Sequence, residues 1–93
     1  MLEDWILRKK QIEDSKNSLQ GADLCNAKLM QAKLKGACLE DADLTAAYLI
    51  KADLSEANLV RADLTQAVLS EANLSGANFD GAELMDTFLN GAN

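Results

Sequence analysis

Carboxylate side chains recur at intervals of twenty residues along this 93-residue chain. They are Asp23, Asp43, Asp63 and Glu83. Clustered carboxylates favour hard cations such as Ca²⁺, and an acidic surface favours a basic protein partner over a nucleic acid. The set offers one carboxylate per twenty residues, without the additional carboxylates and carbonyl oxygens of a Ca²⁺ cage. We therefore expect no metal site and no cofactor, and we treat the four acids as a candidate acidic face.

Two cysteines are the other residues that could do chemistry. Cys25 and Cys38 lack the spacing of zinc ligands, and the chain contains no histidine to complete a metal site. The sequence also has no glycine-rich phosphate loop, and no serine or cysteine beside a plausible general base. We expect two reduced thiols and a protein that is not an enzyme.

A repeat of five residues positions all of these side chains. Leu, or Phe at Phe79, occupies every fifth position from Leu19 to Leu89, and Ala precedes it by two residues from Ala22 to Ala82, whereas Thr87 departs from the pattern. An α-helix would scatter these positions over every face, and a continuous strand would place successive Leu side chains on opposite faces. Only a chain that points Ala and Leu inward and then turns a corner satisfies the pattern. Four corners close a coil of twenty residues, and successive coils stack about 4.8 Å apart.

The residues at the proposed corners support this assignment of inward and corner positions. All five glycines follow a Leu or Phe centre by two residues, at the proposed corner: Gly21, Gly36, Gly76, Gly81 and Gly91. Proline is absent, as expected where many main-chain N–H groups must donate between coils.

These residues resemble the pentapeptide-repeat family, whose pattern is A-(D/N)-L-x-x, over about residues 17–93. The resemblance implies an all-β right-handed quadrilateral β-helix of about four coils. It also implies a bacterial source, since the family is common in bacteria, and most members have no established activity. Asp or Asn fills the middle position at Asp23, Asp43, Asp53, Asn58, Asp63, Asn73 and Asn78. The departures are Lys28, Lys33, Cys38, Tyr48, Val68, Glu83 and Phe88.

Several departures share one face, because residues twenty apart become neighbours on adjacent coils. The candidate apolar interaction face comprises Met30, Tyr48, Ile50, Val68 and Phe88. Stacked aromatic and β-branched side chains stabilise a sheet by about 0.2 to 1 kcal/mol per pair, so this face has a purely structural interpretation. A contiguous exposed apolar patch also marks a contact surface, and both interpretations stay open here.

The segment before the repeats has the period of a helix. We expect a capping helix over about residues 2–14, within an N-terminal cap of residues 1–16 that precedes the β-helix of residues 17–93. Leu2, Trp5 and Ile6 are the residues expected to cover the first coil. The alternative is a membrane-surface or partner-binding helix. No run of about 18 apolar residues and no basic-then-apolar leader are present, so we expect a cytoplasmic protein without a membrane partner.

The last coil is expected to expose its inward side chains and its main-chain edge. Leu74, Phe79, Leu84 and Leu89 form this candidate dimer end. If the chain is a complete natural product, a two-fold homodimer would cover it; if it is an excised fragment, the end marks missing coils.

The function expected from the sequence is a non-catalytic protein-interaction or scaffold module with an unidentified protein partner. The runner-up follows from the resemblance, because some family members imitate duplex DNA and bind bacterial type II topoisomerases such as DNA gyrase. The net charge of −6 lies wholly in the repeats, since the first sixteen residues contain four acids and four bases. This acidity disfavours nucleic acid as a direct partner.

Overall fold

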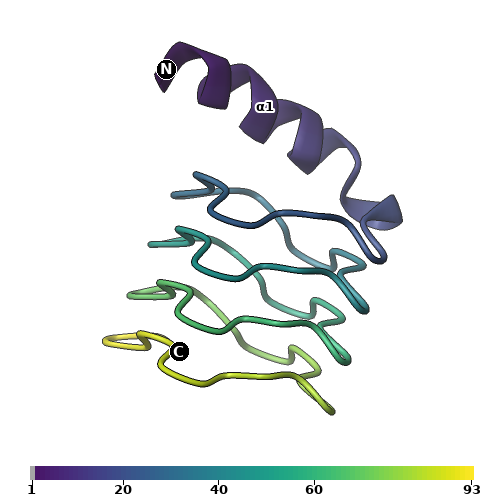
Figure 1. The fold of residues 1–93 in the computed structure, drawn as a ribbon, viewed down its shortest axis with the longest axis vertical. Helices are drawn as coiled ribbons and strands as arrows, with labels where there is room; N and C mark the ends of the chain where they lie inside the picture. The colour runs from purple at the N-terminus through teal and green to yellow at the C-terminus, as the bar shows by residue number, and fades with distance from the viewer. Residues whose placement is uncertain (1) are drawn as a thin grey trace.

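The computed structural model describes residues 2–93, with side chains from residue 4 onward. One α-helix, α1 (Leu2–Asp14), lies at one end of a stack of coils, and the 3₁₀ helix η1 (Lys16–Ser18) leads into the first coil (Figure 1). α1 occupies the range expected from the sequence. Within residues 2–93, no helix has the length and apolar character needed to span a membrane.

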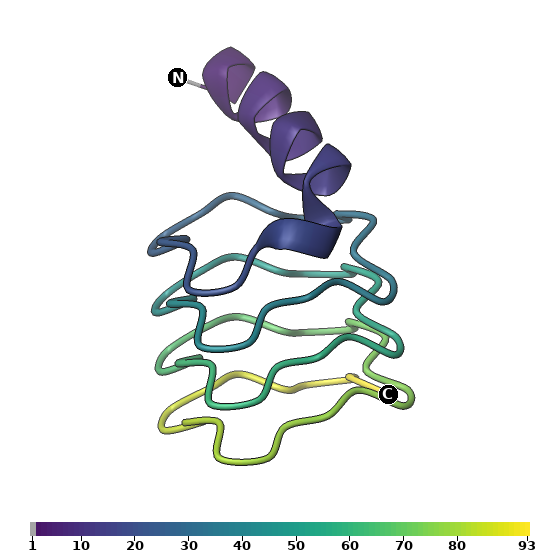
Figure 2. The same cartoon turned by 90° about the vertical axis from the view of Figure 1, so that its right-hand side faces the viewer.

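The repeats form a β-helix, in which the chain returns to the same face after twenty residues. Parallel β-bridges join single residues twenty apart, from Asp23 with Asp43 to Val68 with Phe88. We refer to residues 19–38, 39–58, 59–78 and 79–93 as coils 1 to 4; Figure 2 shows them stacked along one axis. The described residues contain no strand longer than one bridge, because the chain turns a corner after each bridged residue.

Main-chain hydrogen bonds join each coil to the next. Asp43 donates its N–H to the carbonyl oxygen of Ala22 at 2.9 Å, and its own carbonyl oxygen accepts the N–H of Leu24 at 2.8 Å. The same pair of bonds recurs at successive bridges and gives the stack its register. Each middle residue is thereby tied to the coil on its N-terminal side.

Every corner adopts one left-handed backbone conformation. The fifteen corner residues, spaced by five from Gly21 to Gly91, have φ between 57° and 72°, and ten of them are not glycine. The Ala after each corner donates to the preceding centre, as in Ala32 N–H to Leu29 C=O at 3.0 Å, which with one positive φ describes a type II turn. A left-handed residue other than glycine costs roughly 1 to 2 kcal/mol. The inter-coil bonds formed at corners such as Lys51, whose N–H donates to Ser70 at 2.9 Å, help offset this cost.

Leu and Ala side chains fill the interior of the coils. From Leu29 to Leu69 every centre is fully buried. In coil 4 the inward side chains are less covered, with Leu84 40% and Leu89 43% exposed, because no further coil packs beneath them among the described residues. The interior is a column of leucine with alanine beside it, as the repeat predicts.

α1 packs on coil 1 through Trp5, as expected, but through Ile12 in place of Ile6. Ile12 is buried and Trp5 is half-buried against the core, whereas Ile6 is 62% exposed. The helical period explains this correction: Ile12 lies about 20° from Trp5 around the helix and Ile6 lies about 100° from it. The side chain of Leu2, also expected in the cap, lies outside the described residues.

Charged side chains of the N-terminal segment complete the outer main-chain edge of coil 1. A carboxylate oxygen of Glu13 accepts the N–H of Lys33 at 2.8 Å. Lys9 donates to the carbonyl oxygen of Met30 at 3.2 Å, and Lys16 donates to that of Lys35 at 2.9 Å. The segment therefore supplies donors to carbonyl oxygens of this edge and an acceptor to one of its N–H groups.

Candidate functional site

The acidic face is a continuous ladder across four coils. Bridges join Asp23 to Asp43, Asp43 to Asp63, and Asp63 to Glu83. The aspartates also have a local role, because each accepts the main-chain N–H two residues later; the bond from Thr65 to Asp63 measures 3.0 Å. The Thr65 hydroxyl donates to the same oxygen at 2.6 Å. These carboxylates thus hold the turn that follows them, which gives Asp a structural reason to occupy the position.

Hydrogen bonding keeps several aspartates ionised. The Cys25 thiol, followed by the Thr45 hydroxyl and N–H, donates to Asp43 and lowers the pKa of its carboxyl. Ser55 donates to Asp53 from its hydroxyl and its N–H and lowers that pKa in the same way. The donors stabilise the charged form, so the faces that contain these residues keep their negative charge to a lower pH than free aspartate would.

Cys25 joins the acidic face, which the sequence reasoning did not anticipate. Its Sγ donates to Oδ2 of Asp43 at 3.0 Å, and this hydrogen bond is the largest cause that raises the pKa of the thiol to about 12. One potential ligand atom from each of Asp23, Cys25 and Asp43 lies within 4.8 Å of the others. Without a bound cation the neighbouring carboxylates keep this thiol protonated at neutral pH, so metal ligation would have to release its proton. The twenty-residue register was the available signal, since it places Cys25 beside the coil that contains Asp43.

An ion-pair cluster interrupts the acidic surface at one corner. Arg61 donates from Nε to Asp41 at 2.8 Å and from Nη2 to Glu40 at 2.6 Å. The bond from Arg61 lowers the pKa of the Asp41 carboxyl. The pairs are exposed, so they contribute little to stability, but they neutralise part of the charge at this corner.

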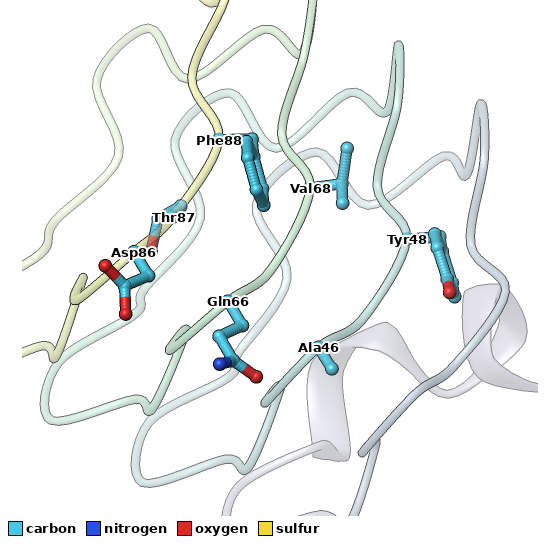
Figure 3. Close-up of a pocket in the computed structure, with 7 residues that line it drawn as sticks. All are labelled: Ala46, Tyr48, Gln66, Val68, Asp86, Thr87 and Phe88. Carbon is cyan, nitrogen blue, oxygen red and sulfur yellow. The ribbon is translucent and has the colours of Figure 1, made fainter.

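The apolar face forms a row of side chains across coils 2 to 4. Tyr48, Val68 and Phe88 are joined by successive bridges, and Tyr48 is 43% and Phe88 55% exposed. Figure 3 shows this row beside a second row formed by Ala46, Gln66 and Asp86. Together with Thr87, the two rows line an open cleft of about 560 Å³. The side chains of Val68 and Phe88 have no oxygen to accept a turn N–H, so this face lacks the local role that aspartate has elsewhere.

A smaller hollow lies between α1 and coil 1. It has a volume of about 210 Å³ and is lined by Trp5, Ile6, Lys9, Lys28, Met30 and Gln31. Lys28 bridges to Tyr48, so this hollow continues directly into the apolar face. Ile50 is half-buried on coil 2, at the position that follows Met30 by one coil.

The candidate dimer end is the least buried part of the interior. Leu74 and Phe79 are half-buried against the core, whereas Leu84 and Leu89 are exposed. The main chain of coil 4 still pairs with coil 3, as in Asn93 N–H to Ala72 C=O at 3.0 Å.

This geometry defines a solenoid of stacked twenty-residue coils built from five-residue units. A family model described as pentapeptide repeats matches the chain in eight copies, over residues 15–45, 47–84 and 57–93. The chain therefore belongs to the pentapeptide-repeat family.

Solved structures agree with this assignment. The crystal structure of alr5209, a pentapeptide repeat protein from Nostoc PCC 7120, is 34% identical with a TM-score of 0.83, and the match covers 99% of this chain and 74% of that one. The pentapeptide repeat protein Rfr23 from the cyanobacterium Cyanothece 51142 is 41% identical with a TM-score of 0.53, over 77% of this chain and 56% of that one. No curated protein sequence matches the chain significantly.

Proposed function

We propose that this chain is a non-catalytic protein-interaction module of the cytoplasm, built on a right-handed quadrilateral β-helix that presents its apolar face to a protein partner. The exposure of Tyr48 and Phe88 is the observation that supports this proposal. Both side chains stand at the middle position of the repeat, which Asp or Asn fills in most units outside this face, and they lie on a face open to solvent. Exposed aromatic side chains that line a cleft favour contact with another macromolecule.

The structural alternative makes a different prediction about substitution. Asn at either position can accept the N–H two residues later, as Asn58 accepts that of Val60 at 3.1 Å. Tyr48→Asn and Phe88→Asn therefore restore a local bond while they remove the apolar contact surface. The fold should persist in both variants, so a loss of binding can be assigned to the surface.

The test is quantitative capture of host proteins on the immobilised chain. We expect Tyr48→Asn and Phe88→Asn to lose specific binders that the natural chain retains. Asp53→Asn is the matched control, because it changes the same repeat position on another face and keeps the bond to Ser55. Identical sets of captured proteins from the natural chain and the apolar-face variants would contradict the proposal.

The second candidate function is modulation of a DNA-binding enzyme such as DNA gyrase through the acidic face. The unbroken ladder from Asp23 to Glu83 supports it. A supercoiling assay with the purified chain over a salt series tests it. Inhibition or protection that weakens as salt rises favours DNA mimicry, and the absence of any effect favours the interaction module.

A further inference from the structure

Apolar side chains form one strip along the axis of the solenoid, from α1 to coil 4. This axial strip comprises Ile6, Met30, Tyr48, Ile50, Val68 and Phe88. It joins the hollow beside α1 to the cleft of the apolar face through the bridge between Lys28 and Tyr48. All six side chains are exposed or half-buried, so the strip presents a continuous surface.

Charges are distributed unevenly along this strip. Lys9, Lys28 and Lys51 lie toward its α1 end, on α1, coil 1 and coil 2. Glu71 and Asp86 lie toward the other end, on coils 3 and 4. The two ends of the strip therefore carry opposite charge.

We propose that the axial strip is covered by a second copy of this chain, which lies antiparallel against it about a two-fold axis between coils 2 and 3. This proposal rests on the proposed function, which makes the apolar face a contact surface, and it names the partner. The chain then associates side by side rather than through its ends.

The two-fold axis determines which coils meet. Coil 1 faces the partner's coil 4, and coil 2 faces the partner's coil 3. Tyr48 then packs against the partner's Val68, and Lys28 lies over the ring of the partner's Phe88, close to the partner's Asp86. Lys51 meets the partner's Glu71 at the edge of the strip. Each contact occurs twice, and each joins groups that attract: an aromatic with a β-branched side chain, a cation with a ring, and a cation with a carboxylate.

A second copy fits this strip better than a partner of uniform charge. An all-acidic or all-basic partner would match one end and be repelled at the other, whereas the reversed strip matches both ends. The molecule, α1 included, measures 32 × 26 × 19 Å, so a side face that extends over α1 offers roughly 600 Å². Standard protein interfaces bury about 800 Å² per partner, so we expect a dimer of moderate affinity.

Pairing through the coil 4 end is the competing arrangement. Coil 4 contains Asp80, Glu83 and Asp86 and no basic residue. An end-to-end two-fold dimer would bring these like charges together. Side-by-side pairing instead directs Asp86 toward a lysine of the other copy.

The decisive experiment measures coupling between Lys28 and Asp86. Within one chain they lie three coil spacings apart, about 14 Å at 4.8 Å per coil, beyond the Debye length of about 8 Å at physiological salt. Coupling between them therefore arises between two chains. In sedimentation equilibrium of the full chain, we expect Lys28→Glu and Asp86→Lys each to raise the dimer Kd about tenfold, because each breaks two symmetric contacts. The variant with both substitutions should return to within about threefold of the natural chain.

Glu56→Lys is the matched control for Asp86→Lys. Both acids occupy exposed corners with similar backbone conformation, φ 61° for Glu56 and 57° for Asp86, but Glu56 lies outside the axial strip. Its substitution should leave the dimer Kd unchanged. Far-ultraviolet circular dichroism of every variant confirms that the coils remain folded.

Two outcomes would overturn the inference. One is a chain that stays monomeric up to the millimolar range; the other is a dimer indifferent to Lys28 and Asp86 but abolished by Leu89→Asp, which indicates end-to-end pairing. A monomeric chain whose Tyr48→Asn variant loses host binders would refute the dimer and leave the proposed function standing. Recovery in the double-swap variant, with host capture unaffected by Tyr48→Asn, would support the dimer and identify the second copy, rather than another host protein, as the partner of the apolar face.

Discussion

Removing the carboxylate of Glu13 should destabilise the end of the solenoid on which α1 packs. This carboxylate accepts the N–H of Lys33 at 2.8 Å and is half-buried between α1 and coil 1. A hydrogen bond to a charged group contributes about 1.5 to 3 kcal/mol, and partial exposure places this one near the lower limit. Two other effects oppose the loss in Glu13→Ala. Alanine is the better helix former, and a negative charge near a helix C-terminus is unfavourable, which together amount to about 0.5 to 1 kcal/mol.

The net expectation for Glu13→Ala is a destabilisation of about 0.5 to 1 kcal/mol, which corresponds to roughly 2 to 8 °C in melting temperature for a chain of this size. Thermal unfolding measures the total, and amide hydrogen exchange at Lys33 measures the bond itself. Glu13→Gln keeps an acceptor oxygen and should fall between the natural chain and Glu13→Ala. Asp14→Ala is the control, because its contact with Lys10 at 3.5 Å is exposed and should contribute less than about 0.5 kcal/mol.

The reasoning is refuted if Glu13→Ala melts at or above the temperature of the natural chain while exchange at Lys33 is unchanged. In that case the helical propensity and dipole effects would dominate, and the bond from Lys33 to Glu13 would contribute nothing to holding α1 on coil 1.

Three further predictions concern the coils. Leu54→Ala, at a fully buried centre, should lower stability by about 3 to 5 kcal/mol in denaturant titration, whereas Leu84→Ala in the exposed part of coil 4 should cost less than half of that. Hydrogen bonds lower the native pKa of Asp43 and Asp53, so the contribution of these carboxylates to stability is complete above the unfolded pKa of about 3.9 and is lost as pH falls through the native pKa values. The melting temperature of the natural chain should therefore fall at acid pH, and that of Asp53→Asn should fall less. Cys25 is exposed, yet its pKa of about 12 should make its alkylation by iodoacetamide at pH 8 slower than that of a free thiol, and Asp43→Asn should accelerate it; equal rates before and after the substitution would contradict this account.

The periodic part of the molecule was predictable because each pentapeptide has the same order of inward and corner residues. Inward Leu centres, corners at Gly21 and its equivalents, and contacts at a separation of twenty all follow from that period, as the bridge of Asp23 with Asp43 confirms. The repeat also puts residues such as Lys51 and Glu56 at corners, which indicates from the sequence alone that the corner tolerates residues other than glycine. It did not reveal that aspartate accepts the N–H that follows it, because that role depends on side-chain geometry.

The non-periodic part was predictable only in outline. The range of α1 followed from helical periodicity, but its rotation over coil 1 depends on the turn through η1, which no repeat specifies. The burial of Ile12 in place of Ile6 and the bond from Lys33 to Glu13 both result from that rotation. The twenty-residue register was sufficient to predict that Cys25 lies near Asp43. It was not sufficient to predict the rotamers that bring Sγ and Oδ2 to 3.0 Å.

Because all corners are equivalent, the face on which a residue lies depends only on how many pentapeptides precede it. Because φ is nearly the same at every corner from Gly21 to Gly91, a duplication or deletion of one pentapeptide preserves the local fold wherever it occurs. Each such event shifts every later residue by one corner of the coil. A change of twenty residues restores the original alignment, whereas a single added pentapeptide between Tyr48 and Val68 would move Val68 and Phe88 round to a neighbouring face. A gene of this kind can therefore rearrange its surface through length changes alone, while its leucine core stays intact.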